Sequence, residues 1–530
     1  MASTPEAFIQ EITQAAREHY IEYTHAMWEA ATTGSEEANQ REKEAQRQQM
    51  RFWADPDRFQ RTLELDQAGS TDPVTARSLR VIRLSAAKAQ QSESTIQRIT
   101  ELEAEIRQTY YNFRPEVAGK SLSDNELDEI LLESDSTEQV RQAWLASKEV
   151  GQRVAADLRE LVRARNLAAQ EQGYRDHFAR SLELNEIDED ELFHLFDQIQ
   201  KLTQAPYQEL MEMIRHRQAD RFDITVQELQ PWHFGDRFFQ RAPSLSDDDF
   251  TEYFKGHDPV PLALAAFDAW GLEVRDILER SDLYAREGKN QHAFCLDLDR
   301  SGDVRTLNNL EPTHRWISTL LHELGHAVYD KNISPDLPWL LRKPPHTLST
   351  EAIAVLTPRI MANPEWLRQH LGLTAAQADQ AVESAHLRRQ AGRLIFSRWV
   401  LVMTHFERAM YQNPDSDLNE LWWDLKERFQ GLSRPEGRHE PDWAAKYHLA
   451  LAPVYYHNYL LGYLVSAQIE SKLEQEIGVF SLNDRVGSFL RERVFAPGAS
   501  LPWHEHVKVS TGRPLDPSHF TKILTGMVNE

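Results

Sequence analysis

The stretch LLHELGHAVYDK, Leu320 to Lys331, decides how this chain can fold. Apolar residues recur at positions that cover much of a helical circumference here, and Thr313 is a suitable N-cap. We therefore predict a helix from Thr313 to about Lys331 that is buried on most faces. A second helix is predicted at TEAIAVLTPRI, with Ser349 or Thr350 as its cap, because prolines in PDLPW and RKPPHTLS exclude a helix before it.

The first predicted helix carries three residues that together indicate a catalytic metal. His322 and His326 are four positions apart, so their imidazoles lie one turn apart on one face and can share an ion. Glu323 lies about 100° further round, where it reaches a water on the metal without binding the metal. Imidazoles on a buried helix are costly unless they are bonded or ligated. The arrangement is typical of a zinc hydrolase with Glu323 as general base.

A catalytic zinc needs a third protein ligand, and the residues near the motif offer Asp330, His346, Glu351 and Glu365. Asp330 lies too near His326 along the helix to join the same ligand set, but it can orient a ligand imidazole. His346, in a proline-rich loop, is more simply a solvated side chain. Glu351 opens the next helix and can be aimed inward by it. We select Glu351 as the third ligand.

The bulk properties of the chain restrict its partners and its location. The formal net charge is −24 over 530 residues and no basic stripe occurs, so nucleic acid is not expected to bind. Cys295 is the one cysteine, which excludes intramolecular disulfides and favours a reducing compartment. No secretory leader or apolar run of about 18 residues is visible. We therefore expect a cytoplasmic protein without a membrane segment.

The pattern along the chain predicts a mainly α-helical fold in one integrated domain, residues 1–530, with subdomains. Charged amphipathic segments up to about Ile106 predict long helices separated by turns at ADPD and GSTDP. Helical pattern continues over residues 121–221, with breaks at 134–136 and 185–188. Residues 222–246 are rich in aromatic and turn-forming residues and predict an ordered loop.

The segment QHAFCLDLDRSGDVRTLNNL, residues 291–310, is predicted to form a β-hairpin around the turn DRSGD. Asp297, Asp299, Ser301 and Gly302 also match the first half of an EF-hand calcium loop. The twelfth position is Asn308, where such a loop needs a bidentate Glu. The hairpin is the better interpretation.

A second chemically rich stretch is KYHLALAPVYYHNYLLGYL, residues 446–464, which contains a lysine, two histidines and five tyrosines. Hydrolysis of a peptide needs donors for the developing oxyanion, and phenol and imidazole groups can supply them. An aromatic stripe at helical spacing is, however, more often core packing.

Several ordered motifs resemble the angiotensin-converting-enzyme (peptidyl-dipeptidase A) family of zinc peptidases. HELGHAVYD followed by TEAIAVL is similar to the family's HEMGH and its later EAIGD. LWWDLKERFQGL is similar to EWWSLRLKYQGL, and AKYH to AKFH. The closing PGASLPWHEHVKVSTGRPLDPSHF also resembles the end of this family and of its thimet-oligopeptidase and oligoendopeptidase F relatives.

This resemblance implies a large helical ellipsoid with a deep substrate channel between two subdomains and a small hairpin beside the zinc site. Residues 1–110 would form a helical lid, 285–360 the hairpin and zinc-binding helices, and 440–470 the segment that binds substrate and transition state. One Zn²⁺ per chain would be held by His322, His326 and Glu351. The resemblance further assigns substrate contacts to His292 and the Ala293 backbone.

Roles in the C-terminal part follow from the same resemblance. His448 matches the family's transition-state histidine, and Lys446 matches the anchor for the substrate's terminal carboxylate. A family Tyr-x-x-Tyr pair falls on Tyr456 and Tyr459 when one inserted residue is allowed, and on Tyr455 and Asn458 without it; we prefer the first, because Asn cannot replace a phenol.

Two departures from the family affect the expected specificity. The family's glutamine in its WAQTW segment has no clear counterpart in QPWHFGDRF, residues 230–238, so the carboxylate clamp is incomplete. The acidic residue one turn after the zinc-binding glutamate is replaced by Val355, which leaves Asp330 as the substitute that orients a ligand.

The sequence therefore predicts zinc-dependent hydrolysis of short unfolded peptides, with release of C-terminal dipeptides. Oligoendopeptidase and Taq-type metallocarboxypeptidase activities are the alternatives, and an inactive peptide-binding protein is a further one. The intact Glu323 argues against the last, because a pure binder needs no base beside the metal. The sequence gives no oligomeric state.

Overall fold

The computed structural model describes residues 4–243, 245, 250–478 and 482–525. The chain forms two compact units, each built from several separate segments. Unit 1 comprises residues 1–90, 248–385 and 461–519, and unit 2 comprises residues 91–247, 386–460 and 520–530. Three of the five points at which the chain passes between units lie within helices, namely α16 (Ala375–Gln412), α19 (Tyr456–Ile477) and α22 (Ser518–Thr525).

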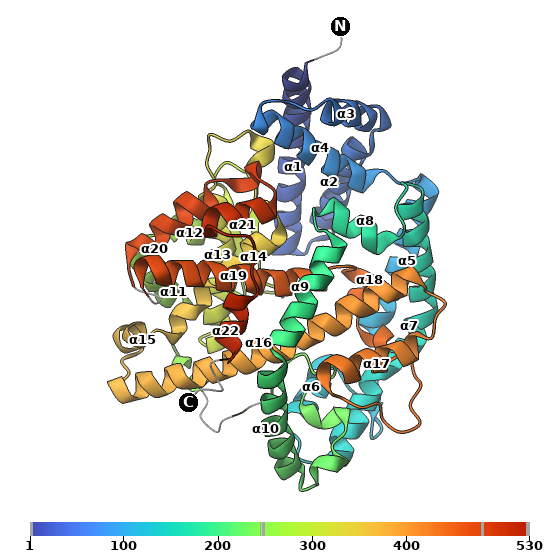
Figure 1. Ribbon diagram of the computed structural model, residues 1–530, viewed down its shortest axis with the longest axis vertical. Coiled ribbons are helices and arrows are strands. Elements are labelled where there is room, and N and C mark those ends of the chain that lie inside the picture. The colour runs from blue at the N-terminus through green and yellow to red at the C-terminus, as the bar shows by residue number, and fades with distance from the viewer. Residues whose placement is uncertain (1–3, 244, 246–249, 479–481, 526–530) are drawn as a thin grey trace. The chain divides into compact units, whose positions relative to one another are not determined.

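Unit 1 contains the N-terminal helices and the helix with the HExxH motif (Figure 1). Its helices are α1 (Pro5–Thr33), α2 (Glu36–Ala54), α3 (Pro56–Ala68), α4 (Pro73–Ala89), α11 (Pro259–Ala269), α12 (Arg275–Arg280), α13 (His314–Lys331), α14 (Thr347–Ala354), α15 (Pro364–Leu371), α20 (Asp484–Phe489) and α21 (Trp503–Thr511). A π-helical turn, Leu490–Phe495, and 3₁₀ turns at Phe250–Phe254, Trp339–Leu341, Thr357–Ala362 and Gly498–Ser500 complete it.

The breaks between α2 and α3 and between α3 and α4 fall where the sequence predicted turns, whereas the break between α1 and α2 was not predicted. Side chains of Asp55 and Asp72 accept hydrogen bonds from backbone amides three positions on, and a proline follows each as the first helical residue. Proline is favoured there because it has no N–H and its φ suits a helix. The predicted breaks at ADPD and GSTDP are confirmed.

Unit 2 is also helical, and α5 and α7 pack side by side within it (Figure 1). Its helices are α5 (Glu93–Asn112), α6 (Asp124–Glu133), α7 (Thr137–Gln170), α8 (His177–Leu184), α9 (Glu189–Leu202), α10 (Gln204–Phe222), α17 (Leu418–Gln430) and α18 (His448–Leu451). The caps Ser136 and Asp188 accept backbone hydrogen bonds at the two predicted breaks. Short 3₁₀ turns occur at Val226–Glu228, Pro231–Phe234 and Asp442–Ala445.

The described residues include two antiparallel sheets of two strands each. The first, β1 (Glu116–Val117) with β2 (Lys120–Ser121), was not foreseen from the sequence. The described part of the loop at 222–246 forms 3₁₀ turns and bends, while residues 244 and 246 lie outside the described residues. The prediction of a mainly α fold with a small hairpin is confirmed. Within the described ranges, no helix is both long and apolar enough to cross a bilayer.

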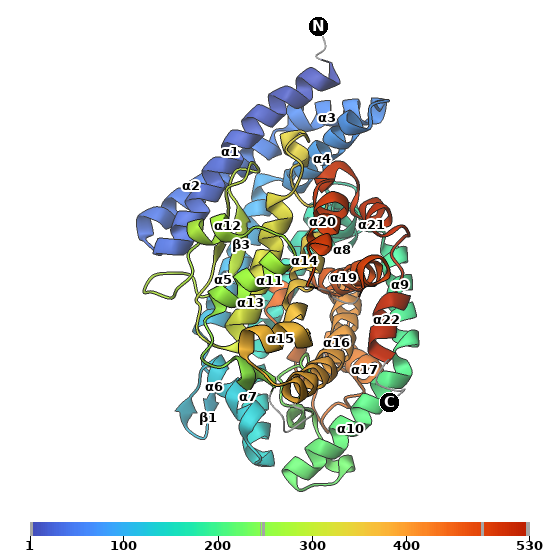
Figure 2. The same cartoon turned by 90° about the vertical axis from the view of Figure 1, so that its left-hand side faces the viewer.

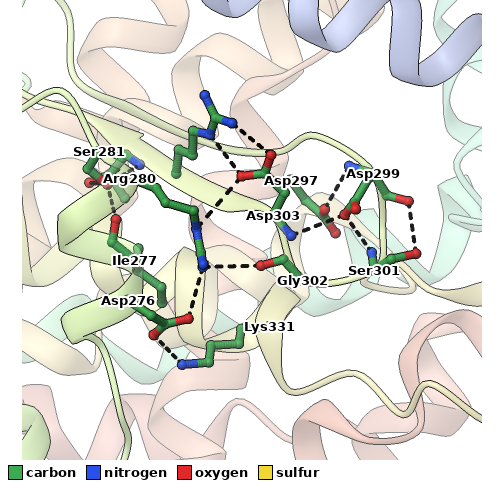
Figure 3. Close-up of polar contacts among 12 residues, drawn as sticks. Asp276, Ile277, Arg280, Ser281, Asp297, Asp299, Ser301, Gly302, Asp303 and Lys331 are labelled. Carbon is green, nitrogen blue, oxygen red and sulfur yellow. Dashed lines mark hydrogen bonds and ion pairs between the residues drawn. The ribbon is translucent and has the colours of Figure 1, made fainter.

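The second sheet is the hairpin that the sequence predicted, β3 (Phe294–Asp297) with β4 (Val304–Leu307), and it packs against α13 (Figure 2). Oδ1 of Asp297 accepts from the amides of Asp299 and Arg300, and Oδ1 of Asp299 accepts from those of Ser301 and Asp303 (Figure 3). The carboxylates that resemble half a calcium loop therefore shape the turn.

Ion pairs fix this hairpin turn to the helices around it (Figure 3). Arg280 of α12 donates to Asp276 and to the carbonyl of Gly302 in the turn. Lys331, the last residue of α13, donates to Asp276 at 2.5 Å and to the carbonyl of Glu273 at 2.8 Å. The turn, α12 and the end of the HExxH helix are thus connected by one network.

Helix α1 is also fixed to the hairpin. Tyr20 donates its phenol hydrogen to the carbonyl of Asp297 at 2.7 Å, and Thr24 donates to that of Leu298 at 2.7 Å. The Arg300 guanidinium lies over the rings of both Tyr20 and Trp339. The first helix of the predicted lid region is therefore attached to the same sheet that packs against α13.

Candidate active site

Helix α13 forms as predicted and gives the site a rigid base. Thr313 is its N-cap and accepts a hydrogen bond from the amide of Trp316, and the helix ends at Lys331. The apolar residues that cover its circumference are buried: Ile317, Leu320, Leu321, Leu324, Ala327 and Val328. A helix packed on so many sides cannot easily rotate, so its polar residues keep fixed directions.

A glycine allows α14 to pack directly on α13. A Cβ atom at Gly325 would lie 2.8 Å from Cα of Ala354 and 2.7 Å from Oγ1 of Thr357. The hydroxyl of Thr357 donates to the carbonyl of Leu321 at 2.8 Å and so joins the two segments. This close approach brings Glu351 of α14 to the face of α13 that carries the two histidines.

His322, His326 and Glu351 form a group whose ligand atoms lie within 4.8 Å of one another. Nε2 of His326 is 3.5 Å from Oε2 of Glu351, and Nε2 of His322 is 3.9 Å from Oε1. Ligand atoms around a tetrahedral zinc, with bonds of about 2.0–2.1 Å, are themselves about 3.3 Å apart. Two imidazoles and one carboxylate are also a known ligand set for catalytic zinc. The residues present therefore fit the metal.

Residues of α14 contact both imidazoles. Nδ1 of His326 is hydrogen-bonded to Oγ1 of Thr350 at 2.8 Å. Burial lowers the pKa of His322 to about 4, although the charge of Glu351 and a hydrogen bond with the backbone of Ala354 act in the opposite direction. Both Nε2 atoms are left facing Glu351.

The hydrogen-bond partner of Nδ1 of His326 is Thr350 and not Asp330, so the orientation of a ligand imidazole by Asp330 stays a prediction. Burial raises the pKa of the Asp330 carboxyl to about 7, with a further rise from Asp297. Burial lowers the pKa of His326, but its hydrogen bond to Glu351 and the charge of Glu351 outweigh this effect, and Asp330 adds a smaller increase. Asp330 was predicted to orient a ligand imidazole because it lies one turn beyond His326 on the same helix.

The other candidate ligands have different roles. His346 is the N-cap of α14, and its Nδ1 accepts from the amide of Leu348 at 3.1 Å. The predicted cap at Ser349 or Thr350 is therefore wrong, since α14 starts at Thr347. Glu365 lies in α15, where it accepts a hydrogen bond from Gln369.

Glu323 is 8% exposed and follows the first histidine on α13. Burial raises the pKa of its carboxyl to about 7, His326 lowers it, and Glu351 raises it further. A carboxyl that titrates near neutral pH can both accept and return a proton in one catalytic cycle. Its environment suits a general base and acid.

His292 and Ala293 directly precede β3, and the His292 side chain is exposed. Among the described residues, β3 has one strand partner, β4, while β4 is also bridged by Asp282. Apart from the carbonyl of Asp297, which accepts from Tyr20, the outer edge of β3 offers backbone groups of the kind to which an extended peptide can pair.

The remaining predicted site residues belong to unit 2. Lys446 directly follows the 3₁₀ turn Asp442–Ala445, and His448 is the first residue of α18. Tyr456 and Tyr459 lie at the start of α19, three positions apart. The ring of His448 lies 5.0 Å from that of Tyr456. Asn458, at the position without the insertion, is buried, and its Oδ1 has no hydrogen-bond partner among the described residues.

A buried carboxylate holds the link between α18 and α19. Glu407 of α16 accepts a hydrogen bond from the amide of Val454 at 2.8 Å. Val454 has φ of 51°, a left-handed conformation that is rare for a β-branched residue and therefore needs support from its surroundings. The path of the chain from His448 to Tyr456 depends on this contact.

Gln240 is a residue that the sequence comparison missed. It accepts a hydrogen bond from Nζ of Lys446 at 2.9 Å. Burial lowers the pKa of Lys446 to about 7, while Asp236 raises it. Gln240 lies two residues beyond the segment QPWHFGDRF in which a counterpart of the family's glutamine was sought. A longer comparison window around GDRFFQ would have included it.

Comparisons with known proteins agree with this geometry. The model of peptidase family M3 matches residues 130–525, a range that contains all the ligand and catalytic residues predicted above. The model described as angiotensin-converting enzyme matches residues 2–233.

Individual relatives are distant but extend over most of the chain. An angiotensin-converting enzyme of Haematobia irritans exigua is 23% identical over 446 residues, 73% of this chain and 70% of the relative. The angiotensin-converting enzyme-like protein Ace3 of Mus musculus is 22% identical over 553 residues, 95% of this chain and 73% of the relative. Because the family model covers well over half of it, the chain belongs to peptidase family M3, a family of zinc-dependent metallopeptidases, and it is related to the angiotensin-converting enzymes.

Proposed function

We propose that this protein is a zinc peptidase that releases dipeptides from the free C-terminus of short peptides. The observation that carries the proposal is the convergence of His322, His326 and Glu351, with Glu323 beside them on α13. Bound zinc would supply a Lewis acid that acidifies water and polarises a peptide carbonyl.

Residues of the chain would transfer the proton, stabilise the oxyanion and bind the substrate. Glu323 accepts the proton of the attacking water and later gives it to the leaving amine, which its near-neutral pKa permits. By resemblance, His448 and Tyr459 donate hydrogen bonds to the oxyanion. The backbone at Ala293 and the outer edge of β3 hold the substrate in an extended form.

Dipeptide release is supported by the pairing of Lys446 with Gln240. A carboxylate is acceptor-only, and an ammonium with an adjacent amide NH₂ offers it donors of suitable charge and geometry. The amide of Gln240 now gives its oxygen to Lys446, so its NH₂ group can face a ligand. Such a clamp would fix the terminal carboxylate of a substrate. The distance from the clamp to the metal would then set how many residues are released.

The family M3 match favours one second candidate, cleavage inside an oligopeptide without a need for its terminal carboxylate. An N-blocked decapeptide distinguishes the two. The proposal predicts products that lack two, four and six C-terminal residues, as measured by mass spectrometry, and no products with Glu323→Gln or with chelator. Internal cuts that persist with an amidated peptide would establish the endopeptidase instead, and loss of single residues would establish a carboxypeptidase.

A further inference from the structure

Thr350 contacts a predicted zinc ligand from the side opposite to the metal position. Its Oγ1 lies 2.8 Å from Nδ1 of His326, while Nε2 of the same ring lies 3.5 Å from Oε2 of Glu351. Thr350 and Glu351 are consecutive residues of α14. One helical segment thus supplies both the third ligand and the partner of the second ligand.

The chemistry of imidazole gives this contact a direction. A histidine that binds a metal through Nε2 carries its ring proton on Nδ1, so Nδ1 must donate. The hydroxyl of Thr350 then accepts that hydrogen bond. An oxygen at this place selects the tautomer and the rotation of the ring, and such partners typically change metal affinity about 10- to 100-fold.

We propose that Thr350 is the positioning residue of His326 and raises the affinity of the site for zinc, an inference that rests on the proposed function. The usual partner of a ligand histidine is a carboxylate or a carbonyl. Here the near carboxylate, Asp330, makes no hydrogen bond to the ring, and the position one turn after Glu351 is Val355. The neutral hydroxyl of Thr350 therefore supplies the hydrogen bond to the His326 ring.

The packing of the two helices keeps this hydroxyl in place. The absence of a side chain at Gly325 lets the α14 backbone approach α13, and Thr357 joins α14's C-terminal side to the carbonyl of Leu321. The β-branched side chain of threonine has few χ1 rotamers in a helix, so its hydroxyl is directed with little loss of entropy. Gly462 of α19 leaves room for the Glu351 side chain, since a Cβ there would lie 3.3 Å from its Cγ.

The test is the zinc affinity of the full chain, measured by competition with a chromogenic chelator. Thr350→Val keeps the shape and removes the hydroxyl, and we expect zinc to bind about 10- to 100-fold more weakly. Thr350→Ser restores the hydroxyl and should bind zinc within about threefold of wild type. Ser349→Ala is the matched control, because the Ser349 hydroxyl is buried on the same helix and makes no hydrogen bond among the described residues; it should bind zinc like wild type.

The absorption spectrum of the cobalt-substituted chain gives a second readout. Thr350→Val should alter the visible bands of the bound cobalt, whereas Thr350→Ser and Ser349→Ala should leave them unchanged, with equal melting temperatures of the metal-free proteins. If the valine variant does not fold, Thr350→Ala removes the same hydroxyl without adding a methyl group beside the ring.

The outcomes separate this inference from the proposed function. Wild-type affinity in a folded Thr350→Val or Thr350→Ala variant, or no recovery in Thr350→Ser, would overturn the role of Thr350 alone. A wild-type chain that binds no zinc would overturn the proposed function and this inference together.

Discussion

Nζ of Lys446 donates a hydrogen bond to Oε1 of Gln240 at 2.9 Å, and the lysine is only 5% exposed. Taking an ammonium out of water is costly unless a partner compensates it. The Gln240 amide, the rings of Phe238 and Trp399 and the charge of Asp236 compensate only part of this cost, so burial still lowers the pKa of this lysine to about 7. The pair is therefore prepared to accept an anion.

The first prediction concerns substrates with and without a free C-terminal carboxylate. Replacing Lys446 with Ala removes the charged donor, and a hydrogen bond to a charged group is worth about 1.5–3 kcal/mol, roughly 10- to 150-fold. Wild type should therefore cleave the free acid at least tenfold better than its amide, measured as kcat/KM, and Lys446→Ala should lose this preference. Lys508→Ala, at an exposed lysine of α21, should retain it. Equal preference in wild type and Lys446→Ala would refute the clamp.

The same preference should depend on pH. The amine of Lys446 is charged below its pKa of about 7 and loses its proton as the pH rises through that value. Since kcat/KM reports on the free enzyme, the ratio of acid to amide cleavage should be largest below pH 7 and should fall towards pH 9. A ratio that stays constant from pH 6 to pH 9 would show that Lys446 remains charged or makes no contact with substrate.

The close approach of α13 and α14 gives a prediction for Gly325→Ala. The new Cβ would meet Cα of Ala354 at 2.8 Å, so the helices must separate, at a cost of about 1–3 kcal/mol in stability. Glu351 would move with α14, and zinc affinity should fall as well. Gly392→Ala is the matched control, because a Cβ there has nothing within 4 Å, and it should stabilise its helix by about 0.5–1 kcal/mol. Thermal unfolding and chelator competition measure both effects; tight zinc binding by Gly325→Ala would contradict the packing argument.

The buried Glu407 gives a prediction for stability against pH. Burial raises its pKa to about 8 in the folded protein, despite the opposing effects of the Val454 amide and Arg165. Between about pH 4.5 and pH 8 the folded state keeps a proton that the unfolded state has released, so stability falls as pH rises through this window. Glu407→Gln removes this loss and can still accept from Val454. The free energy of unfolding of Glu407→Gln, relative to that of wild type, should therefore increase from pH 5 to pH 8.

The gain from Glu407→Gln should be at most on the order of 1 kcal/mol per pH unit. Melting temperatures at pH 5, 6.5 and 8 measure it. Glu212→Gln, at an exposed position of α10, should show no such trend. A difference between Glu407→Gln and wild type that is the same at every pH would argue against a buried, protonated Glu407.

The parts of the candidate site that depend on local spacing could be predicted from the sequence. His322 and His326 are placed by the helical repeat, and the hairpin of β3 and β4 follows from alternation around a turn. Glu351 could be selected because it lies on the next predicted helix, although α14 begins four residues earlier, at Thr347. These features depend on residues close in the chain, for which periodicity and capping are informative.

Contacts between distant segments could not be predicted in this way. Thr350 reaches His326 across 24 positions, and Gln240 reaches Lys446 across 206. His346 is the cap of α14 because its ring accepts a hydrogen bond from the amide of Leu348. Serine and threonine are ordinarily better caps, which is why Ser349 or Thr350 was predicted instead. Such partners are decided by how helices pack, which one sequence does not show.

The central claim is that Glu323 moves the proton while His322, His326 and Glu351 hold the metal. Glu323→Gln keeps the size of the side chain and removes its basicity. General base catalysis contributes about 10²- to 10⁴-fold to the rate, so kcat should fall by at least about 100-fold while zinc remains bound. Glu351→Gln should instead lose zinc, because it replaces a charged ligand by a neutral one.

The most direct measurement is therefore zinc content by elemental analysis together with turnover of a quenched peptide, for wild type and Glu323→Gln. We predict one zinc per chain in both proteins, with turnover in wild type and a loss of at least about 100-fold in the variant. Zinc-loaded wild type that cleaves no peptide, or a Glu323→Gln variant that cleaves at the wild-type rate, would contradict this account.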